Sequence, residues 1–260
     1  RPSRMHAPAM PDRPICSPAA PPLTIAEHPE WQHGDRLRAE KEALGLYLSG
    51  RPFEAYRDMA QHLTSGSLAD VTSIKPPPEA GNGGSFAQPR RNATVAGLIF
   101  DIRRRGNRTT LTLDDDTGRI EIQLYAEMVD AVRHLLVKDA VVIASGQLRW
   151  DNFLTGWSLS TRSLRDINHV IEEQARRLVL TLEKSDDDAE AMLQLRALKE
   201  ALEPHLGGAC EVAVEYCVGG KTAQLAFGER WRVRASRDLR QALAALPGAA
   251  ALRLAFTTEH

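Results

Sequence analysis

Residues 119–125, RIEIQLY, alternate polar and apolar side chains without interruption, and this stretch constrains the fold more than any other. Ile120, Ile122 and Leu124 fall on one face and the polar residues between them fall on the other. That is the pattern of a β-strand with one buried side, because a helix would scatter the three apolar side chains around its axis. Such a strand needs partner strands, and we look for them in the flanking sequence.

The sequence on both sides of this strand predicts four more strands and one helix. Two alternating segments joined by the turn RRRGNR (103–108) precede it, and a helical segment and two further strands follow it. The predicted strands cover 93–102, 109–115, 140–150 and 153–167, and the predicted helix covers 126–139. This order is that of an OB-fold barrel, which binds oligonucleotides on its second and third strands. We therefore assign residues 92–168 to an OB-fold nucleic-acid-binding domain.

Composition divides the sequence before the barrel into three segments. Residues 1–34 are rich in proline and predict a disordered tail. Residues 75–91 are rich in glycine and proline and predict a flexible linker. Between them, residues 35–74 form a helical segment that predicts a short hairpin, with one helix from Asp35 to a stop at Gly50 and a second that opens at Pro52 and ends near Leu63.

The sequence after the barrel, residues 174–257, predicts a second folded unit with the order β-α-β-β-α-β. Residues 229–235 are expected to continue an extended run, and Ser236 is expected to cap the second helix. We interpret the order as a split β-α-β arrangement. The predicted fold class is α+β and multidomain: a short helical hairpin, a five-stranded OB-fold β-barrel and a C-terminal split β-α-β (βαββαβ-like) domain.

The turn between the first two predicted strands carries most of the chemistry that the sequence offers. It holds four arginines around one Gly-Asn pair, at a loop that borders the binding groove of an OB-fold. Guanidinium groups there can contact phosphates or stack on bases, although a basic tip that only aids solubility is the alternative. The predicted nucleic-acid-binding residues are Arg103, Arg104, Arg105, Asn107, Arg108, Arg119, Tyr125, Trp150 and Phe153.

The aromatic residues of this set lie at strand ends and are possible platforms for stacking bases. Burial inside the barrel is the alternative for each of them, and we assign Trp157 to the core. The barrel segment carries ten basic and ten acidic side chains, and the whole chain has a net charge of −1. We therefore expect any binding of nucleic acid to be local, weak and sensitive to salt.

No arrangement of residues in the sequence predicts a catalytic site. Asp114, Asp115 and Asp116 could suggest a magnesium site, but Asp and Gly are expected in a tight turn for backbone reasons. Residues 186–188 are interpreted as the charged start of a helix. Three cysteines without a CxxC motif predict free thiols, and no apolar run predicts a membrane span or a secretory signal. We expect a cytoplasmic protein without metal or cofactor. Because it starts without methionine, we also expect a fragment of a longer chain.

Several motifs of the chain resemble one known family. Residues 40–52, EKEALGLYLSGRP, resemble the segment before the OB domain in the alpha subunit of bacterial replicative DNA polymerase III. Residues 95–127 and 141–148 resemble the OB domain of that family. Residues 202–205 and 227–236 resemble its C-terminal domain. The resemblance extends over nearly all of the predicted folded chain.

The resemblance implies that the chain is the C-terminal part of a DNA-directed DNA polymerase, which is a nucleotidyltransferase. The catalytic aspartates of that family and their Mg²⁺ lie in an upstream palm domain outside this sequence. We therefore expect no polymerase activity from this chain alone.

The resemblance also implies partners. They are single-stranded template DNA for the OB domain, the tau subunit of the clamp loader for the C-terminal domain, and other polymerase III core subunits. The sliding-clamp peptide of the family, Q-x-x-(L/M)-F, is not found in residues 1–31. Two alternatives remain open: a tRNA-binding OB-fold appendage like that of an aminoacyl-tRNA synthetase, and a module that binds only protein.

Overall fold

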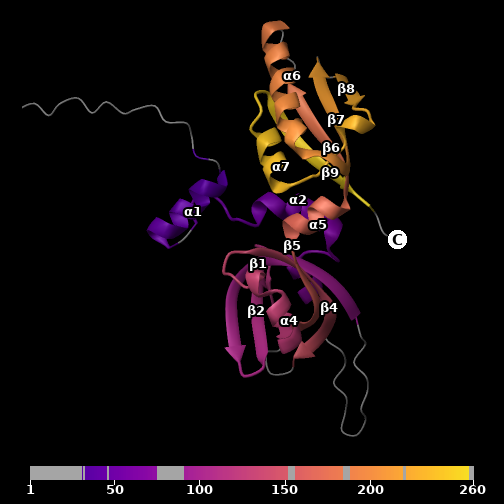
Figure 1. Cartoon of the computed structure of the whole chain (residues 1–260). Helices are drawn as coiled ribbons and strands as arrows, with labels where there is room; N and C mark the ends of the chain where they lie inside the picture. Colours follow the sequence, from indigo (N-terminus) through magenta and orange to yellow (C-terminus); the bar gives the residue numbers. More distant parts are fainter. Residues whose placement is uncertain are drawn as a thin grey trace, which may run out of the picture.

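The structure is a computed structural model that describes residue 31 and the ranges 33–45, 47–74, 91–151, 156–183, 188–218 and 221–257. A β-barrel and a four-stranded sheet form two lobes, and helices α2 (Arg57–Leu63) and α5 (Ile167–Gln174) lie between them (Figure 1). The predicted α+β multidomain class is confirmed. Among the helices within the described ranges, none combines the length and apolar character needed to cross a membrane.

Five strands close the barrel in the order β1-β2-β3-β5-β4, which confirms the predicted OB-fold. Only the contact between β3 and β5 is parallel, and it closes the barrel. The strands are β1 (Arg91–Arg105), β2 (Arg108–Asp114), β3 (Arg119–Tyr125), β4 (Val141–Asp151) and β5 (Gly156–Asp166). The helix between β3 and β4 is shorter than predicted. It consists of α4 (Ala126–Ala131) and the 3-10 helix η2 (Arg133–Leu135), before Asp139 takes a positive φ of 67°.

The alternation of β3 has the predicted effect, because Ile120, Ile122 and Leu124 are all buried in the barrel core. The predicted turn over 103–108, however, is wrong in its extent. Strand β1 runs through Arg105 and β2 begins at Arg108, so only Gly106 and Asn107 reverse the chain. Gly106 adopts a φ of +54°, which few side chains tolerate. A bulge in β1 between Ile99 and Asp101 changes which side chains face outward.

The helical segment before the barrel differs from the predicted hairpin. Helix α1 (His33–Leu44) ends before the predicted stop at Gly50, because Gly45 takes a φ of +75° and the Glu40 carboxylate accepts hydrogen bonds from the backbone N–H groups of Leu48 and Ser49. The second helix is present as η1 (Glu54–Tyr56) and α2, and it ends at Leu63 as predicted. A third helix, α3 (Leu68–Thr72), starts in a capping box and was not predicted. The predicted tail and linker lie outside the described residues, except that α1 begins at His33 and β1 at Arg91.

The turn between β2 and β3 fastens the helical segment to the barrel. The carboxylate of Asp115 is buried and accepts a hydrogen bond from the backbone N–H of Leu68 at 2.8 Å, at the start of α3. The carboxylate of Asp116 accepts hydrogen bonds from Arg51 at 2.6 Å and from Arg57 at 3.3 Å. Asp114 accepts one from Arg119 of β3. Structural contacts therefore account for the three carboxylates that the sequence also offered as a metal site.

The second lobe contains one mixed sheet in the order β8-β7-β6-β9. Its elements are β6 (Ala175–Glu183), α6 (Asp188–Leu202), η3 (Glu203–His205), β7 (Leu206–Val218), β8 (Lys221–Ala226), η4 (Glu229–Trp231), α7 (Arg237–Ala244) and β9 (Ala249–Phe256). The element order and the Ser236 cap are confirmed. The split arrangement is wrong, because β6 and β7 pair directly and no strand lies between them.

The predicted extended run over 229–235 is also wrong. Residues 229–231 form the short helix η4, in which Trp231 packs partly buried against the core of the second lobe. After this helix Val233 forms isolated bridges with Leu206 and Cys210. A tryptophan that turns toward the core needs a bend in the chain, which an uninterrupted strand would not provide.

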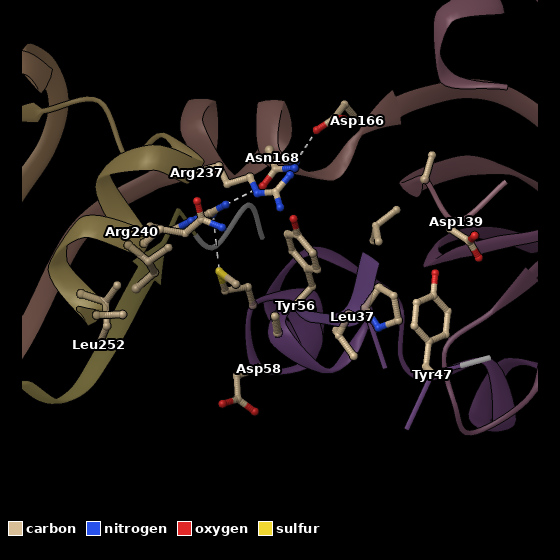
Figure 2. Close-up of a pocket in the computed structure, with 18 of the residues that line it drawn as sticks. Leu37, Tyr47, Tyr56, Asp58, Asp139, Asp166, Asn168, Arg237, Arg240 and Leu252 are labelled. Atoms are coloured by element: carbon tan, nitrogen blue, oxygen red, sulfur yellow. Dashed lines mark hydrogen bonds between the residues drawn. The ribbon is translucent and has the colours of Figure 1, made fainter. Parts of the chain in front are cut away.

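A small shared core joins the two lobes. The predicted last strand of the barrel ends at Asp166, whose carboxylate caps α5 by accepting hydrogen bonds from the next turn. Helix α5 was not predicted, and its residues Ile167, Val170 and Ile171 are buried together with Phe53. On the same side, the buried Arg240 of α7 donates a hydrogen bond to the Asn168 side chain at 2.6 Å (Figure 2). The helical segment, barrel and second lobe therefore pack as one body at this point.

Candidate nucleic-acid interface

The tip between β1 and β2 concentrates positive charge that no carboxylate of the described residues pairs with. Arg105 and Arg108 face each other across the last rung of the hairpin, and Arg104 precedes them in β1. All three side chains are exposed. Within the described part of the chain, none of the three makes an ion pair. Three guanidinium groups without an ion-pair partner among the described residues thus flank the two-residue turn.

Arg103 differs from its neighbours because its charge is already paired. It contacts Asp101 at 3.1 Å and Glu121 at 3.4 Å, and Lys138 lies 3.3 Å from the same Asp101. Hydrogen bonds from Arg103 and then Lys138 hold the pKa of the Asp101 carboxyl below its usual range. The structure therefore separates the four predicted arginines into one neutralised member and three free ones.

Tyr125 is placed beside the tip. It ends β3 directly opposite Arg108, and it is 49% exposed. Its hydroxyl lies 3.1 Å from the hydroxyl of Ser160 on β5, a contact that fixes the direction of the ring. Tyr125, Arg108 and Arg105 lie on the same face of the strands at the carboxyl end of β3, while Arg104 and Asn107 line the pocket against α4.

Arg119 lies at the other end of β3 and has a partner that the sequence analysis missed. Its Nε donates to Asp114 at 2.7 Å, and its guanidinium carbon lies 3.8 Å from the centre of the Phe100 ring. Phe100 is 47% exposed on the outer face. One signal could have revealed it: Leu98, Ile99 and Phe100 are consecutive apolar residues, and a regular strand cannot turn all three inward.

The tryptophans lie near the same end of β3 as Arg119. Trp150 and Trp157 face each other across β4 and β5, with ring centres 5.5 Å apart at an angle of 78°. The indole of Trp157 donates to the carbonyl of Ile74 and packs on the barrel core, as predicted. Trp150 is half-buried against it, which leaves less of its ring for stacking than expected. Phe153 lies outside the described residues.

The predicted residues therefore form two groups rather than one. The tip group lies where β3 ends, because Tyr125 pairs with Arg108. The second group, Arg119 and the tryptophans, lies where β3 begins. Arg119 is the first residue of β3, and Trp157 lies beside it because β5 runs parallel to β3 with Ser158 opposite Glu121. Six residue steps along a strand span about 20 Å. The two groups flank the ends of the β2–β3 surface on which OB-folds bind oligonucleotides.

Among the hollows lined by described residues, one adjoins the tip and a larger one does not. A pocket of about 350 Å³ separates the β1–β2 turn from α4 and is lined by Arg104, Asn107, Asp130 and Arg133 among others. A larger cleft of about 1340 Å³ lies between the helical segment, the start of β4 and the second lobe (Figure 2). Within the described chain, no residue of β2 or β3 lines that cleft, so it is separate from the candidate interface.

The described side chains of the types that carry covalent or metal chemistry lie in surroundings that do not favour such chemistry. Cys210 is a buried free thiol, and burial raises its pKa to about 11, so it is a poor nucleophile. Across the described ranges, His, Cys, Asp and Glu side chains nowhere gather in a group of three that could hold a metal ion. The chemistry on offer in this part of the chain is the charge and stacking of the barrel surface.

Two family models match the chain. Residues 93–167 match the OB-fold nucleic acid binding domain, and residues 197–248 match the C-terminal domain of DNA polymerase III subunit alpha. A solved structure of a Replication Protein A heterotrimer bound to ssDNA is 18% identical, with a TM-score of 0.28. That likeness covers 38% of this chain and 74% of the other, and it is too distant to carry an argument about function.

Curated relatives extend the match beyond the separate domains. DNA polymerase III subunit alpha of Escherichia coli O157:H7 is 33% identical over 249 residues, which is 89% of this chain and 20% of the relative. The same subunit of Vibrio cholerae is 34% identical and covers 88% of this chain and 19% of the relative. The chain thus spans about a fifth of the length of these relatives. It belongs to the DNA polymerase III alpha subunit family and corresponds to the C-terminal region of that subunit.

Proposed function

We propose that the barrel of this chain contacts single-stranded template DNA during replication. The observation that carries the proposal is the tip of three unpaired arginines, Arg104, Arg105 and Arg108, beside the exposed ring of Tyr125. Phosphates meet free guanidinium groups there without breaking an existing ion pair, and bases can stack on exposed rings. The tip lies on the rim of the surface that OB-folds use for oligonucleotides.

The charge balance of the barrel predicts how strong this contact is. Carboxylates on the same outer face are held by cations, as Asp101 is by Arg103 and Asp114 by Arg119. Because these carboxylates are paired, the outer face of the barrel repels phosphate little. Net attraction for phosphate comes from the unpaired arginines at the tip. Three phosphate contacts give modest affinity that falls as salt rises. Such a contact suits a domain that guides a strand while other parts of a polymerase hold it.

Binding to a labelled oligo-dT at low salt tests the proposal. We expect weak binding by the 260-residue chain and loss of binding when Arg103, Arg104, Arg105 and Arg108 are changed together to Ala. The matched control removes the same charge from exposed positions of the second lobe, Arg196, Arg230, Arg234 and Arg237. That control variant should bind like the original chain. Binding that survives the first change, or that is lost equally in both variants, contradicts the role of the tip.

Competition between ligands separates the alternatives. Stronger competition by tRNA than by single-stranded DNA would favour a tRNA-binding appendage. Absence of any nucleic-acid binding at low salt would favour a module that binds only protein. A primer-extension assay with Mg²⁺ should show no nucleotide incorporation by this chain, because the family resemblance places the catalytic aspartates outside it.

We propose further that the second lobe attaches the subunit to the tau subunit of the clamp loader. Support comes from the match of residues 197–248 and from exposed apolar side chains on the neighbouring part of α6. Met192 is 66%, Leu193 64% and Leu195 46% exposed. Apolar side chains in open solvent on one helix are typical of a protein contact.

Binding of purified tau to the chain, measured by surface plasmon resonance, tests this attachment. Changing Met192, Leu193 and Leu195 to Ser should weaken binding at least about tenfold. The control changes Leu44 and Leu48, exposed apolar residues of the helical segment, to Ser. Equal binding by both variants would remove α6 from the contact.

A further inference from the structure

Phe100 and Arg119 form a layered pair on the outer face of the barrel, at the end of β3 away from the arginine tip. The guanidinium carbon of Arg119 lies 3.8 Å above the centre of the phenyl ring. At that distance the planar cation rests on the face of the ring, which attracts it electrostatically. Both side chains stay accessible, with 47% of Phe100 and 55% of the Arg119 side chain exposed.

The bulge in β1 explains why a phenylalanine lies in this position. Ile99 is fully buried opposite Leu113, and the ladder resumes with Asp101 opposite Thr112, so Phe100 is the extra residue. A bulge re-aims side chains, and here it leaves Phe100 half-exposed on the surface. The core gains little from this large apolar side chain, and the structure gives it no other apolar partner among the buried clusters of the described chain.

Asp114 holds the Arg119 guanidinium in place beside the phenyl ring. Its carboxylate accepts a hydrogen bond from Arg119 Nε at 2.7 Å and so occupies one edge of the group. The ring of Phe100 covers one flat face. The Arg119 side chain is still 55% exposed, which leaves room for a ligand at this cation, and guanidinium planes stack well on nucleic-acid bases.

We propose that Phe100 and Arg119 together form a base-stacking platform, in which the ring holds the guanidinium flat and an unpaired base stacks on its open face. This inference rests on the proposed contact with single-stranded DNA and adds a second anchor to it. The platform and the tip lie about 20 Å apart along β3. A single strand would cross the β2–β3 surface with phosphates at the tip and a base at the platform. OB-folds typically engage about 4–16 nucleotides, which fits this span.

Two substitutions test the platform while the charge at the tip stays the same. Arg119→Lys keeps the positive charge but removes the planar group, and Phe100→Leu keeps an apolar side chain but removes the flat ring. Each should lower the affinity for oligo-dT by about fivefold or more, the fold-change expected for one stacked base. Neither should change binding to an abasic oligomer of the same length or the slope of affinity against salt. Arg162→Lys, at an exposed arginine of β5, is the matched control and should change nothing.

Phe100→Trp provides a direct optical readout. The larger ring should retain affinity. The fluorescence that this variant adds to the signal of the four native tryptophans should be quenched when oligo-dT binds but not when the abasic oligomer binds. Equal affinity of Arg119→Lys, Phe100→Leu and the original chain for oligo-dT overturns the platform, as does an equal loss on the abasic oligomer. If the tip variant alone loses binding, the proposed function stands without the platform. If the original chain binds no single strand, both proposals fall.

Discussion

Glu40 shows how a single residue of the N-terminal motif shapes the chain. Its carboxylate accepts hydrogen bonds from the backbone N–H groups of Ser49 and Leu48, at 2.9 and 2.8 Å. These bonds, with that to Ser49 the largest cause, lower the pKa of Glu40 to about 2. The charged form is therefore preferred in the folded chain. An acidic residue at this position folds the segment after α1 back onto the helix.

The pKa of Glu40 leads to a prediction about pH. A lowered pKa means that the stabilising contribution is present above the ordinary pKa of about 4.5 and is lost as the pH falls toward 2. Glu40→Gln should therefore speed amide exchange at Leu48 and Ser49 at pH 6, compared with the original chain at the same pH. The difference should shrink steadily below pH 4.5. An equal difference at pH 6 and pH 2 would show that the carboxylate charge is not involved.

The four arginines near the tip should contribute unequally. Arg103 would have to leave Asp101 and Glu121 before it could meet a phosphate, whereas Arg105 and Arg108 need not leave a partner. We expect Arg105→Ala or Arg108→Ala to weaken binding to oligo-dT several times more than Arg103→Ala. Fluorescence anisotropy at one low salt concentration measures all three variants. An equal or larger effect of Arg103→Ala would contradict the separation into free and paired arginines.

At the scale of the elements, the pairing of β4 with β5 depends on a glycine. A Cβ at Gly146 would lie 2.2 Å from the carbonyl oxygen of Ser160, inside the distance that real contacts permit. Gly146 and Ser160 both belong to paired barrel strands, so a Cβ at position 146 would fit only if β4 and β5 moved apart. This glycine lets two strands approach closely where the register shifts.

Gly146→Ala should therefore destabilise the barrel by about 3 kcal/mol or more. Gly228→Ala is the matched control, because a Cβ there has open space and the residue has an ordinary φ of −69°. Thermal unfolding followed by circular dichroism compares the two. A melting temperature of Gly146→Ala close to that of the control would show that β4 and β5 are not packed this tightly.

The sequence predicted the strands better than the short helices, for a physical reason. Strands such as β3 carry their burial pattern in consecutive residues, so alternation alone reveals them. Helices α3 and α5 have one or two turns and depend on caps and on packing against distant residues, as Leu68 does on Asp115. The bulge that exposes Phe100 likewise depends on the partner strand. The run of apolar residues up to Phe100 was a local signal of an exposed side chain, but its contact with Arg119 and the pairing of Arg103 join residues of different strands and could not be read from local sequence.

At the scale of the whole molecule, the shared core makes the lobes cooperate. Phe53 of the helical segment, Ile143 of the barrel and Ile171 of α5 are buried in one cluster, and Leu254 of β9 packs against it. Arg240 adds a hydrogen bond from α7 to α5 while burial lowers the pKa of its guanidinium. Separation of the lobes would expose this cluster and leave Asn168 without its partner. We therefore expect the barrel and the second lobe to unfold together.

Ile171→Ala tests this cooperation. It should destabilise the chain by about 2–4 kcal/mol through the cavity it leaves, and calorimetry should show one transition shifted as a whole. Leu193→Ala, at an exposed position of α6, should leave the transition nearly unchanged. Two separate transitions, with only one of them shifted in Ile171→Ala, would show that the lobes fold independently.

The salt dependence of binding tests most directly whether the tip arginines meet phosphates. For single-stranded DNA, each released phosphate contact contributes about 0.7 to the slope of log affinity against log salt concentration. Arg104, Arg105 and Arg108 changed together to Gln should therefore reduce that slope by about 2 relative to the original chain. An unchanged slope in this variant, at whatever affinity, would contradict the assignment of the tip as the phosphate contact of the barrel.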